Sequence, residues 1–174
     1  GDPGVAAVPL DSLVARGRLG PGTGRVEISE FTLKAGGAEI GMTGLFEDGP
    51  DRGRANLEGR IGPMPMATLK ALWPRALAPR ARRFAAHNLR KGEVRSGTFR
   101  IATETGPDPT VRTAREAAER RIALTLEGAD IEVEIGKDAP PLEAPRALLR
   151  VEGTSLELNI PDAQISLSQG RKLA

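Results

Sequence analysis

The stretch L-K-A-L-W-P-R-A-L-A-P-R-A-R-R-F-A-A-H-N-L-R-K-G, from Leu69 to Gly92, decides how the chain is organised. It has helical character and lies between two longer halves with β patterning. Pro74 ends a first short helix, because proline has no backbone N–H and disfavours helical geometry in the residue before it. Pro79 suits the first position of a second helix, and Gly92 supplies a left-handed residue to end it. The pattern predicts two short helices around residues 66–91.

The same stretch is strongly basic. Residues 70–95 include eight Lys or Arg and a single Glu, in a chain whose net charge is only +2. Arg80, Arg83, His87 and Arg90 fall near one stripe of the second helix, opposite Phe84. Such a basic face is typical of a solvated helix surface, and it also fits an anionic headgroup or an acidic partner.

Composition narrows the class of protein. The chain has 174 residues, of which 39% are hydrophobic and 28% charged, as in ordinary folded domains. It has no cysteine, so disulfides, cysteine zinc sites and thiol nucleophiles are excluded. Aromatic residues make up 3%, with no tyrosine, which argues against nucleic acid as a partner because base stacking needs aromatic rings. Gly1 is not a natural start, so we interpret the chain as a segment of a longer protein.

The two halves that flank the helices read as antiparallel meanders. Residues 1–62 predict four strands, with a β-bulge near Glu30 and a hairpin turn at Gly36 and Gly37. The helical insert occupies residues 63–92. A second β meander follows over residues 93–174, with a loop at 104–120. The fold class expected is mainly β: a strongly twisted or curled antiparallel sheet that forms an open groove, with a short helical insert.

Alternation is clearest after Arg121, where apolar side chains on one face alternate with acidic ones on the other. An apolar face on successive strands can pack on a second sheet, close into a barrel, or line a trough that holds something apolar. Composition and spacing do not choose among these outcomes. The groove candidates on this face are Ile122, Leu124, Leu126, Ile131, Val133, Ile135, Leu156, Leu158 and Ile160.

The sequence offers no convincing catalytic, cofactor or metal site. His87 is the only histidine, and no acidic residue lies within a helical turn of it. Glu132 and Glu134 are compatible with a carboxylate pair, but a solvated sheet face predicts the same alternation, and we favour the latter. Trp73 is best interpreted as an anchor that seats the helical insert on the sheet, with its N–H on a backbone carbonyl.

The helical insert resembles a known family signature. Trp73-Pro74 follows Leu72, and Ala78, Arg82-Arg83, Asn88-Leu89 and Gly92 come before a strand at 94–101. This set resembles the central signature of AsmA-like envelope proteins, and more narrowly of the YhdP-type branch. The later segment at 139–142, Ala-Pro-Pro-Leu, and the Val-Glu-Gly at 151–153 are also similar, so the resemblance covers roughly residues 60–160. Phe84 departs from the pattern, because the family often has tryptophan there.

The resemblance implies a segment of a periplasmic protein whose parent chain is anchored in the inner membrane of a diderm bacterium. Proteins of this kind are similar to bridges that carry phospholipid between membranes along a curled β-sheet. Phospholipid acyl chains and neighbouring segments of the same parent chain would then be the partners, with membrane contact through regions outside this piece. A structural or protein-interaction module with a closed core and a basic docking face is the alternative.

Overall fold

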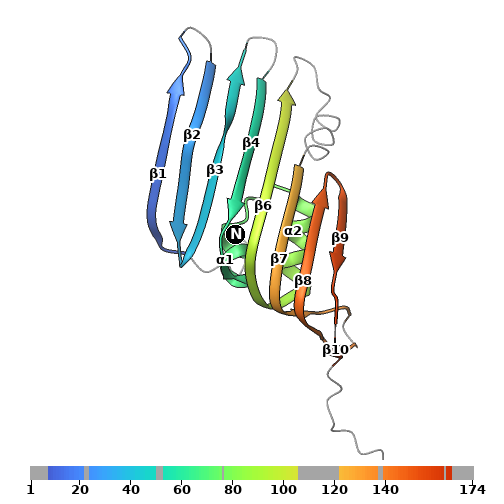
Figure 1. The fold of residues 1–174 in the computed structure, drawn as a ribbon. Coiled ribbons are helices and arrows are strands. Elements are labelled where there is room, and N and C mark those ends of the chain that lie inside the picture. Colours follow the sequence, from blue (N-terminus) through green and yellow to red (C-terminus); the bar gives the residue numbers. More distant parts are fainter. Residues whose placement is uncertain are drawn as a thin grey trace, which may run out of the picture.

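The computed structural model describes residues 8–21, 24–49, 53–75, 77–105, 122–136, 139–162 and 164–165. They form an open antiparallel β-sheet that carries two short helices on one face (Figure 1). The sheet does not close into a barrel. The expected fold class, mainly β and antiparallel with a short helical insert in a curled, open sheet, is confirmed.

Ten strands and two helices follow one another along the described chain. The first four strands are β1 (Leu10–Leu19), β2 (Gly24–Ala35), β3 (Ala38–Asp48) and β4 (Gly53–Ile61). The short β5 (Met64–Pro65) leads into α1 (Met66–Leu72) and α2 (Pro79–Asn88). The remaining strands are β6 (Leu89–Thr105), β7 (Ile122–Val133), β8 (Leu142–Glu152), β9 (Ser155–Asn159) and β10 (Gln164–Ile165).

The strands pair in chain order, so the described part of the sheet is a meander, with β5 and the two helices inserted between β4 and β6. Its order is β1-β2-β3-β4-β6-β7-β8, and β8 is flanked on its other side by β9 and β10. The strand β5 pairs with the start of β6. Every pairing is antiparallel. Short turns suffice for such a topology, which agrees with the frequent glycine and proline of the sequence.

Two local predictions for the first meander are confirmed. The registers of β2 with β1 and β3 both shift next to Glu30, so the bulge lies where the apolar phase slips by one residue. Gly36 and Gly37 both have positive φ, 55° and 78°, in the hairpin that joins β2 to β3. Glycine reaches these angles without the steric cost that a Cβ would bring.

The helical insert begins as expected but ends earlier. The helix α1 stops at Leu72, before Trp73 and Pro74, and α2 starts at Pro79. The prediction that Gly92 ends the second helix was wrong, because α2 ends at Asn88 and Leu89 is already extended.

The early end of α2 has a physical reason in the pairing of Asn88. Its side-chain Nδ2 donates to the Glu134 carbonyl at 2.8 Å, and its own carbonyl accepts from the Glu134 N–H at 2.7 Å. These bonds draw the chain into the sheet. Gly92 does have positive φ, 125°, but inside β6, where a Cβ would lie 2.4 Å from Ile131 Cδ1. Most of the loop expected at 104–120 lies outside the described residues, and β6 runs to Thr105.

The hydrophobic core lies between the helices and the β6–β8 part of the sheet. The small side chains of Ala81 and Ala85 in α2 are 2% and 1% exposed, which lets the helix approach the strands closely. Trp73 is buried, and its Nε1 donates to the Leu77 carbonyl at 2.8 Å. The tryptophan therefore anchors the connection between the two helices, and its N–H bonds a backbone carbonyl as predicted.

Candidate functional site

The register of the sheet aligns apolar side chains on one face from the first strand to the last. Directly paired residues of antiparallel strands point to the same side, so the pairings trace each row across the sheet. One row runs through Ala15, Phe31, Met42, Gly59, Phe99, Leu124, Val151 and Leu156. The helices pack on this same face. The apolar face is therefore continuous across the sheet. It has two regions, one that the helices leave uncovered and one that they cover.

The first region, which we call the β1–β4 apolar surface, is outside the core. All of its residues are partly or fully exposed to solvent, and none belongs to the buried cluster beneath the helices. No described helix or strand covers it. Its members are Leu13, Ala15, Leu19, Val26, Ile28, Phe31, Leu33, Met42, Phe46, Ala55 and Leu57.

Exposure is greatest at the edge of this surface. Leu13 and Leu19 of β1 are 52% and 81% exposed, and Phe46 of β3 is 36% exposed. Isolated exposed apolar residues are common on soluble proteins, but contiguous apolar patches larger than a few hundred Å² mark sites of binding. The members of the β1–β4 apolar surface are neighbours in the strand register, so they form a contiguous patch and not isolated residues.

The second region contains most of the groove candidates chosen from the sequence. Ile122, Leu124, Leu126, Ile131 and Val133 are each 3–6% exposed, because α1 and α2 cover that part of the sheet. The structure thus brings these candidates together on one face but seals them inside the core.

The other four candidates lie at the margin of the covered region. Leu158 and Ile160 are half-buried and pack against the core, and Leu156 in β9 is 36% exposed. Ile135 follows the end of β7 and is 63% exposed. The candidates therefore have two different environments, and only the marginal ones are accessible.

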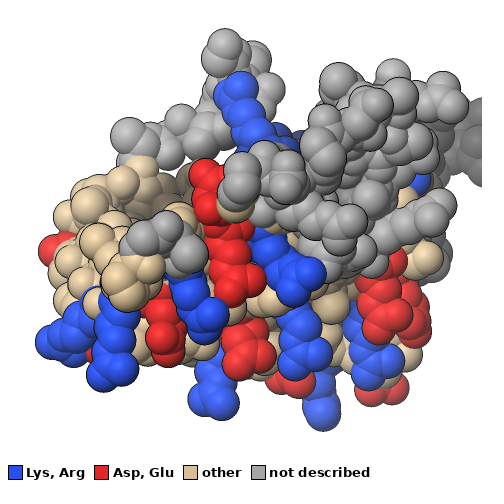
Figure 2. All heavy atoms as spheres, turned by 90° about the horizontal axis from the view of Figure 1, so that it is seen from above, with Lys and Arg blue, Asp and Glu red and all other residues tan. Residues whose placement is uncertain are grey.

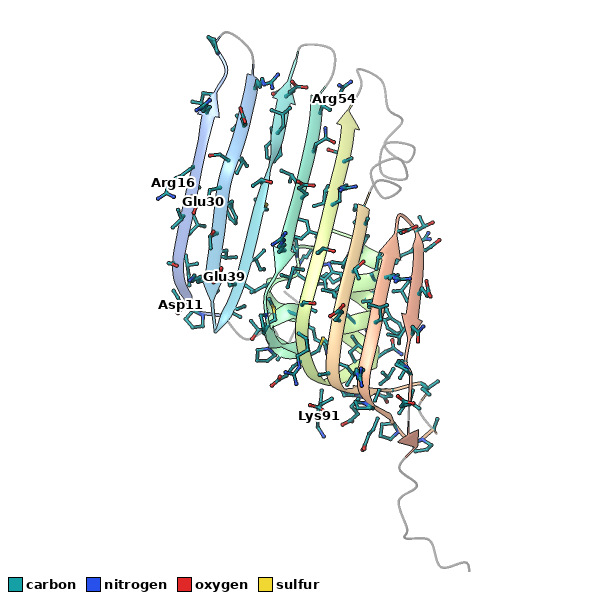
Figure 3. All side chains as sticks on the ribbon, in the orientation of Figure 1. Asp11, Arg16, Glu30, Glu39, Arg54 and Lys91 are labelled. Atoms are coloured by element: carbon teal, nitrogen blue, oxygen red, sulfur yellow. The ribbon has the colours of Figure 1, made fainter. Side chains whose placement is uncertain are left out.

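The opposite face of the sheet is charged, with alternating signs. Viewed along the strands, Lys and Arg interleave with Asp and Glu on this side (Figure 2). Arg16 of β1 pairs with Glu30 of β2 (Figure 3). Further ion pairs join Arg25 to Glu47 at 3.1 Å, Lys34 to Glu39 at 3.1 Å, and Arg100 to Glu58 at 3.6 Å. Such exposed pairs stabilise the fold little individually, but they fix which strands lie side by side.

The larger hollows among the described residues lie mainly on the charged side. Three of about 740, 590 and 680 Å³ are lined mainly by residues of the charged face, together with a few of the apolar face. Thr32, Arg60 and Thr98 line the largest of them, and Arg25 and Asn56 line the second. These hollows thus lie mainly over the polar face, while Phe31 and Met42 of the β1–β4 apolar surface also line the largest of them.

The predicted basic face is split between two elements. Arg80, Arg83 and His87 lie in α2 and are exposed. Arg90 lies beyond the helix, at the start of β6, and pairs with Glu134. The helical stripe expected from the sequence is thus shorter by one arginine, because α2 ends at Asn88.

Lys70 connects α1 to the start of β6. Its ammonium group donates to the Leu89 carbonyl and is partly buried. Burial and the nearby charge of Arg90 lower the pKa of Lys70 from its usual 10.5. At the sheet surface the opposite shift occurs, since hydrogen bonding to Glu132 raises the pKa of Lys91. Lys70 therefore has a structural contact at the junction between helix and strand.

Within the described ranges, no three His, Asp or Glu side chains gather in a way that would hold a metal ion. The described helices include none with the length and apolar character needed to cross a membrane. The ring Nδ1 of His87 lies 2.8 Å from the Arg83 carbonyl, one helical turn earlier.

Sequence reasoning underestimated the first meander as a site. Its apolar residues indicate strands, but the alternation is cleaner after Arg121 and favours candidates in the second meander. The signal that could have found the site was the position of the helical insert. Helices that follow β4 and precede β6 are brought by short connections onto neighbouring strands, which leaves β1 and β2 farthest from them.

Comparisons with family models, with curated proteins and with solved structures found no match to this chain.

Proposed function

We propose that this chain is a segment of a periplasmic cell-envelope protein that binds phospholipid acyl chains on the β1–β4 apolar surface. The parent chain would be anchored in the inner membrane and would conduct phospholipid towards the outer membrane. The resemblance of the helical insert to AsmA-like proteins motivates the proposal. Contact with the membranes themselves would come from regions outside this segment.

The observation that carries the proposal is an apolar face that continues beyond the helices. In the register, Leu57 of β4 is followed by Ile101 of β6, so the row beneath the helices extends onto the β1–β4 apolar surface. Acyl chains lying along this surface would remove apolar area from water, at about 25 cal/mol per Å². Such binding needs no directional contact and no catalytic group.

The charged face supports an arrangement in which only one side of the sheet meets lipid. Its ion pairs join oppositely charged side chains of neighbouring strands, such as Arg25 of β2 and Glu47 of β3. Burying that face in hydrocarbon would cost far more than burying the other, because ionised groups lose their hydration. Water would remain on the charged side and acyl chains on the apolar side.

A pair of leucines on opposite faces provides the test. Leu57 of β4 lies on the β1–β4 apolar surface, and Leu45 of β3 lies on the charged face, and both are half-buried. We would purify the protein without delipidation and record native mass spectra of the wild type, Leu57→Asn and Leu45→Asn. We expect phospholipid bound to the wild type and to Leu45→Asn, and at least about tenfold less bound to Leu57→Asn, since a polar amide opposes acyl contact. A wild-type protein without lipid, or equal loss in both variants, would contradict the proposal.

The second candidate function is a structural or protein-interaction module. It is favoured by the sealed core beneath α1 and α2 and by the hollows lying on the polar side. The exposed Arg80 and Arg83 of α2 would then dock an acidic partner. In the same experiment, this function predicts a folded wild-type protein that carries no lipid.

A further inference from the structure

The two edges of the sheet present strands of different charge. Within the described residues, β1 pairs only with β2 and β9 pairs only with β8, so each has one edge without a strand partner. Every residue of β1 is exposed along its ten-residue length. A long exposed edge strand is a template for pairing with another chain.

The polar side of β1 is basic, whereas that of β9 is acidic. Register places Arg16 and Arg18 on the charged face, opposite Glu30 and Glu27 of β2. In β9, Glu157 lies on that face, opposite Arg150 of β8. Figure 3 shows Arg16 at the outer strand of the sheet. The alternation of signs along the face would therefore continue if Glu157 of one molecule met Arg16 of another.

The strand directions permit such a contact. Seven successive antiparallel pairings lead from β1 to β9, so these two strands run in opposite directions. A second copy placed beside β1 in the same orientation would therefore present its β9 antiparallel to β1. Its charged and apolar faces would coincide with those of the first copy, and both faces would be continued.

The side chains match in one such register. With Glu157 opposite Arg16, Leu158 comes opposite Ala15 and Leu156 opposite Gly17. Apolar side chains then meet on one face and opposite charges on the other, which are the favourable cross-strand combinations. The small residues of β1 leave room for the two leucines of β9.

Pairing of β1 with a second β1 is less favourable. When the faces are kept matched, the polar side of β1 offers only Ser12, Val14, Arg16 and Arg18 to the same residues of the copy, so no opposite charges meet, and registers that bring arginines together are destabilising. The register that brings Asp11 opposite Arg18 sets Leu13 against Arg16, which mixes the two faces. The edges are therefore complementary to each other and not to themselves.

We propose that the β1 edge binds the β9 edge of a second copy of this chain, so that the sheet is extended head to tail. The contact is heterologous, with different surfaces on the two copies, and it leaves a free edge at each end for further copies. The inference concerns the sheet edges and does not depend on lipid binding.

Sedimentation velocity of delipidated protein tests this assembly. Over a roughly hundred-fold range of concentration, we expect the weight-average sedimentation coefficient of the wild type to rise by mass action. Reversing one edge charge, in Arg16→Glu or Glu157→Arg, replaces an attraction by a repulsion and should weaken association about tenfold. The double variant Arg16→Glu/Glu157→Arg restores an opposite-charge pair and should associate nearly as the wild type does.

Arg100 supplies the matched control. Like Arg16 it is an exposed arginine of the charged face paired with a glutamate, Glu58, but it lies on the interior strand β6. Arg100→Glu should leave association unchanged. A wild type that remains monomeric throughout, or a double variant that fails to recover association, would overturn the proposal.

Hydrogen–deuterium exchange of the unmodified protein gives a second measurement that does not depend on how the variants fold. Amides of β1 and β9 should become more protected as concentration rises, whereas those of β6 and β7 should not change. If the protection of the β1 and β9 amides does not change with protein concentration, the proposal is also overturned.

Discussion

The two halves of the sheet share the same alternation but differ in what covers them. Leu124 of β7 and Leu57 of β4 both lie on the apolar face, yet Leu124 is 4% exposed beneath the helices whereas Leu57 is only half-buried. The difference comes from the helical insert, whose apolar and small residues pack on β6–β8. Alternation in a strand therefore identifies an apolar face, while the neighbouring elements decide whether that face becomes a core or a surface.

The largest expected effect comes from truncating one leucine in each half. Leu124→Ala leaves a cavity under the helices and should reduce the free energy of unfolding by about 2–5 kcal/mol. Leu57→Ala removes a side chain that already contacts water and should cost about 1 kcal/mol or less. Urea unfolding curves of both variants would measure the difference. Equal losses would show that the β1–β4 half is packed as tightly as the other, contrary to our description.

Two glycines test how closely the strands pack within the sheet. A Cβ on Gly59 would lie 2.4 Å from the Gly41 carbonyl oxygen and 2.4 Å from the ring of Phe99. Gly59→Ala should therefore destabilise the fold by about 1–3 kcal/mol through steric strain.

Gly41 is the matched control, because a Cβ there meets only the Phe31 carbonyl oxygen, at 3.9 Å. Gly41→Ala should change stability by about 0.5 kcal/mol or less. Thermal unfolding of the two variants would measure the difference in their stability. A Gly59→Ala protein as stable as the wild type would refute the close approach of Phe99.

The hydrogen bond of Trp73 sharpens the account of the covered half. Trp73→Phe keeps an aromatic ring but removes the donor to the Leu77 carbonyl, which should cost about 1 kcal/mol. Denaturant unfolding monitored by circular dichroism would measure the loss. An unchanged stability would mean that the bond does not contribute to holding the two helices together.

The smallest expected effect concerns pH. Because the folded pKa of Lys70 lies below 10.5, the unfolded chain binds more protons between these two values, so this group makes stability rise with pH across that interval. Lys70→Met removes the titrating group and should flatten that part of the profile. Unfolding free energies measured from neutral pH to about pH 10.5 would test this. A profile that falls equally in both proteins would contradict the direction of the shift.

Much of the architecture could be predicted from local signals. The bulge beside Glu30 was visible as a slip in the apolar phase, and the Gly36-Gly37 turn was visible as a hairpin motif. Pro74 indicated the end of the first helix, and Pro79 indicated the start of the second. In each case the determining interaction lies within a few residues of the chain.

The signals that failed depend on distant partners. Gly92 indicated the end of a helix, but Asn88 bonds to Glu134, 46 residues later, and the strand begins first. Most groove candidates lie in strands of the covered half, yet the sequence could not indicate that α1 and α2 lie over Ile122, Leu124 and Leu126. Tertiary packing, which no local pattern reports, decides which apolar face is exposed.

The most direct test of the central claim is site-specific photo-crosslinking. A photoreactive residue would replace Leu57 on the β1–β4 apolar surface, Leu45 on the charged face, or Leu124 beneath the helices. Each protein would be illuminated with vesicles of phosphatidylethanolamine and phosphatidylglycerol. Our account predicts phospholipid adducts from position 57 and little from positions 45 and 124. Adducts from none of the three, or equally from all three, would contradict it.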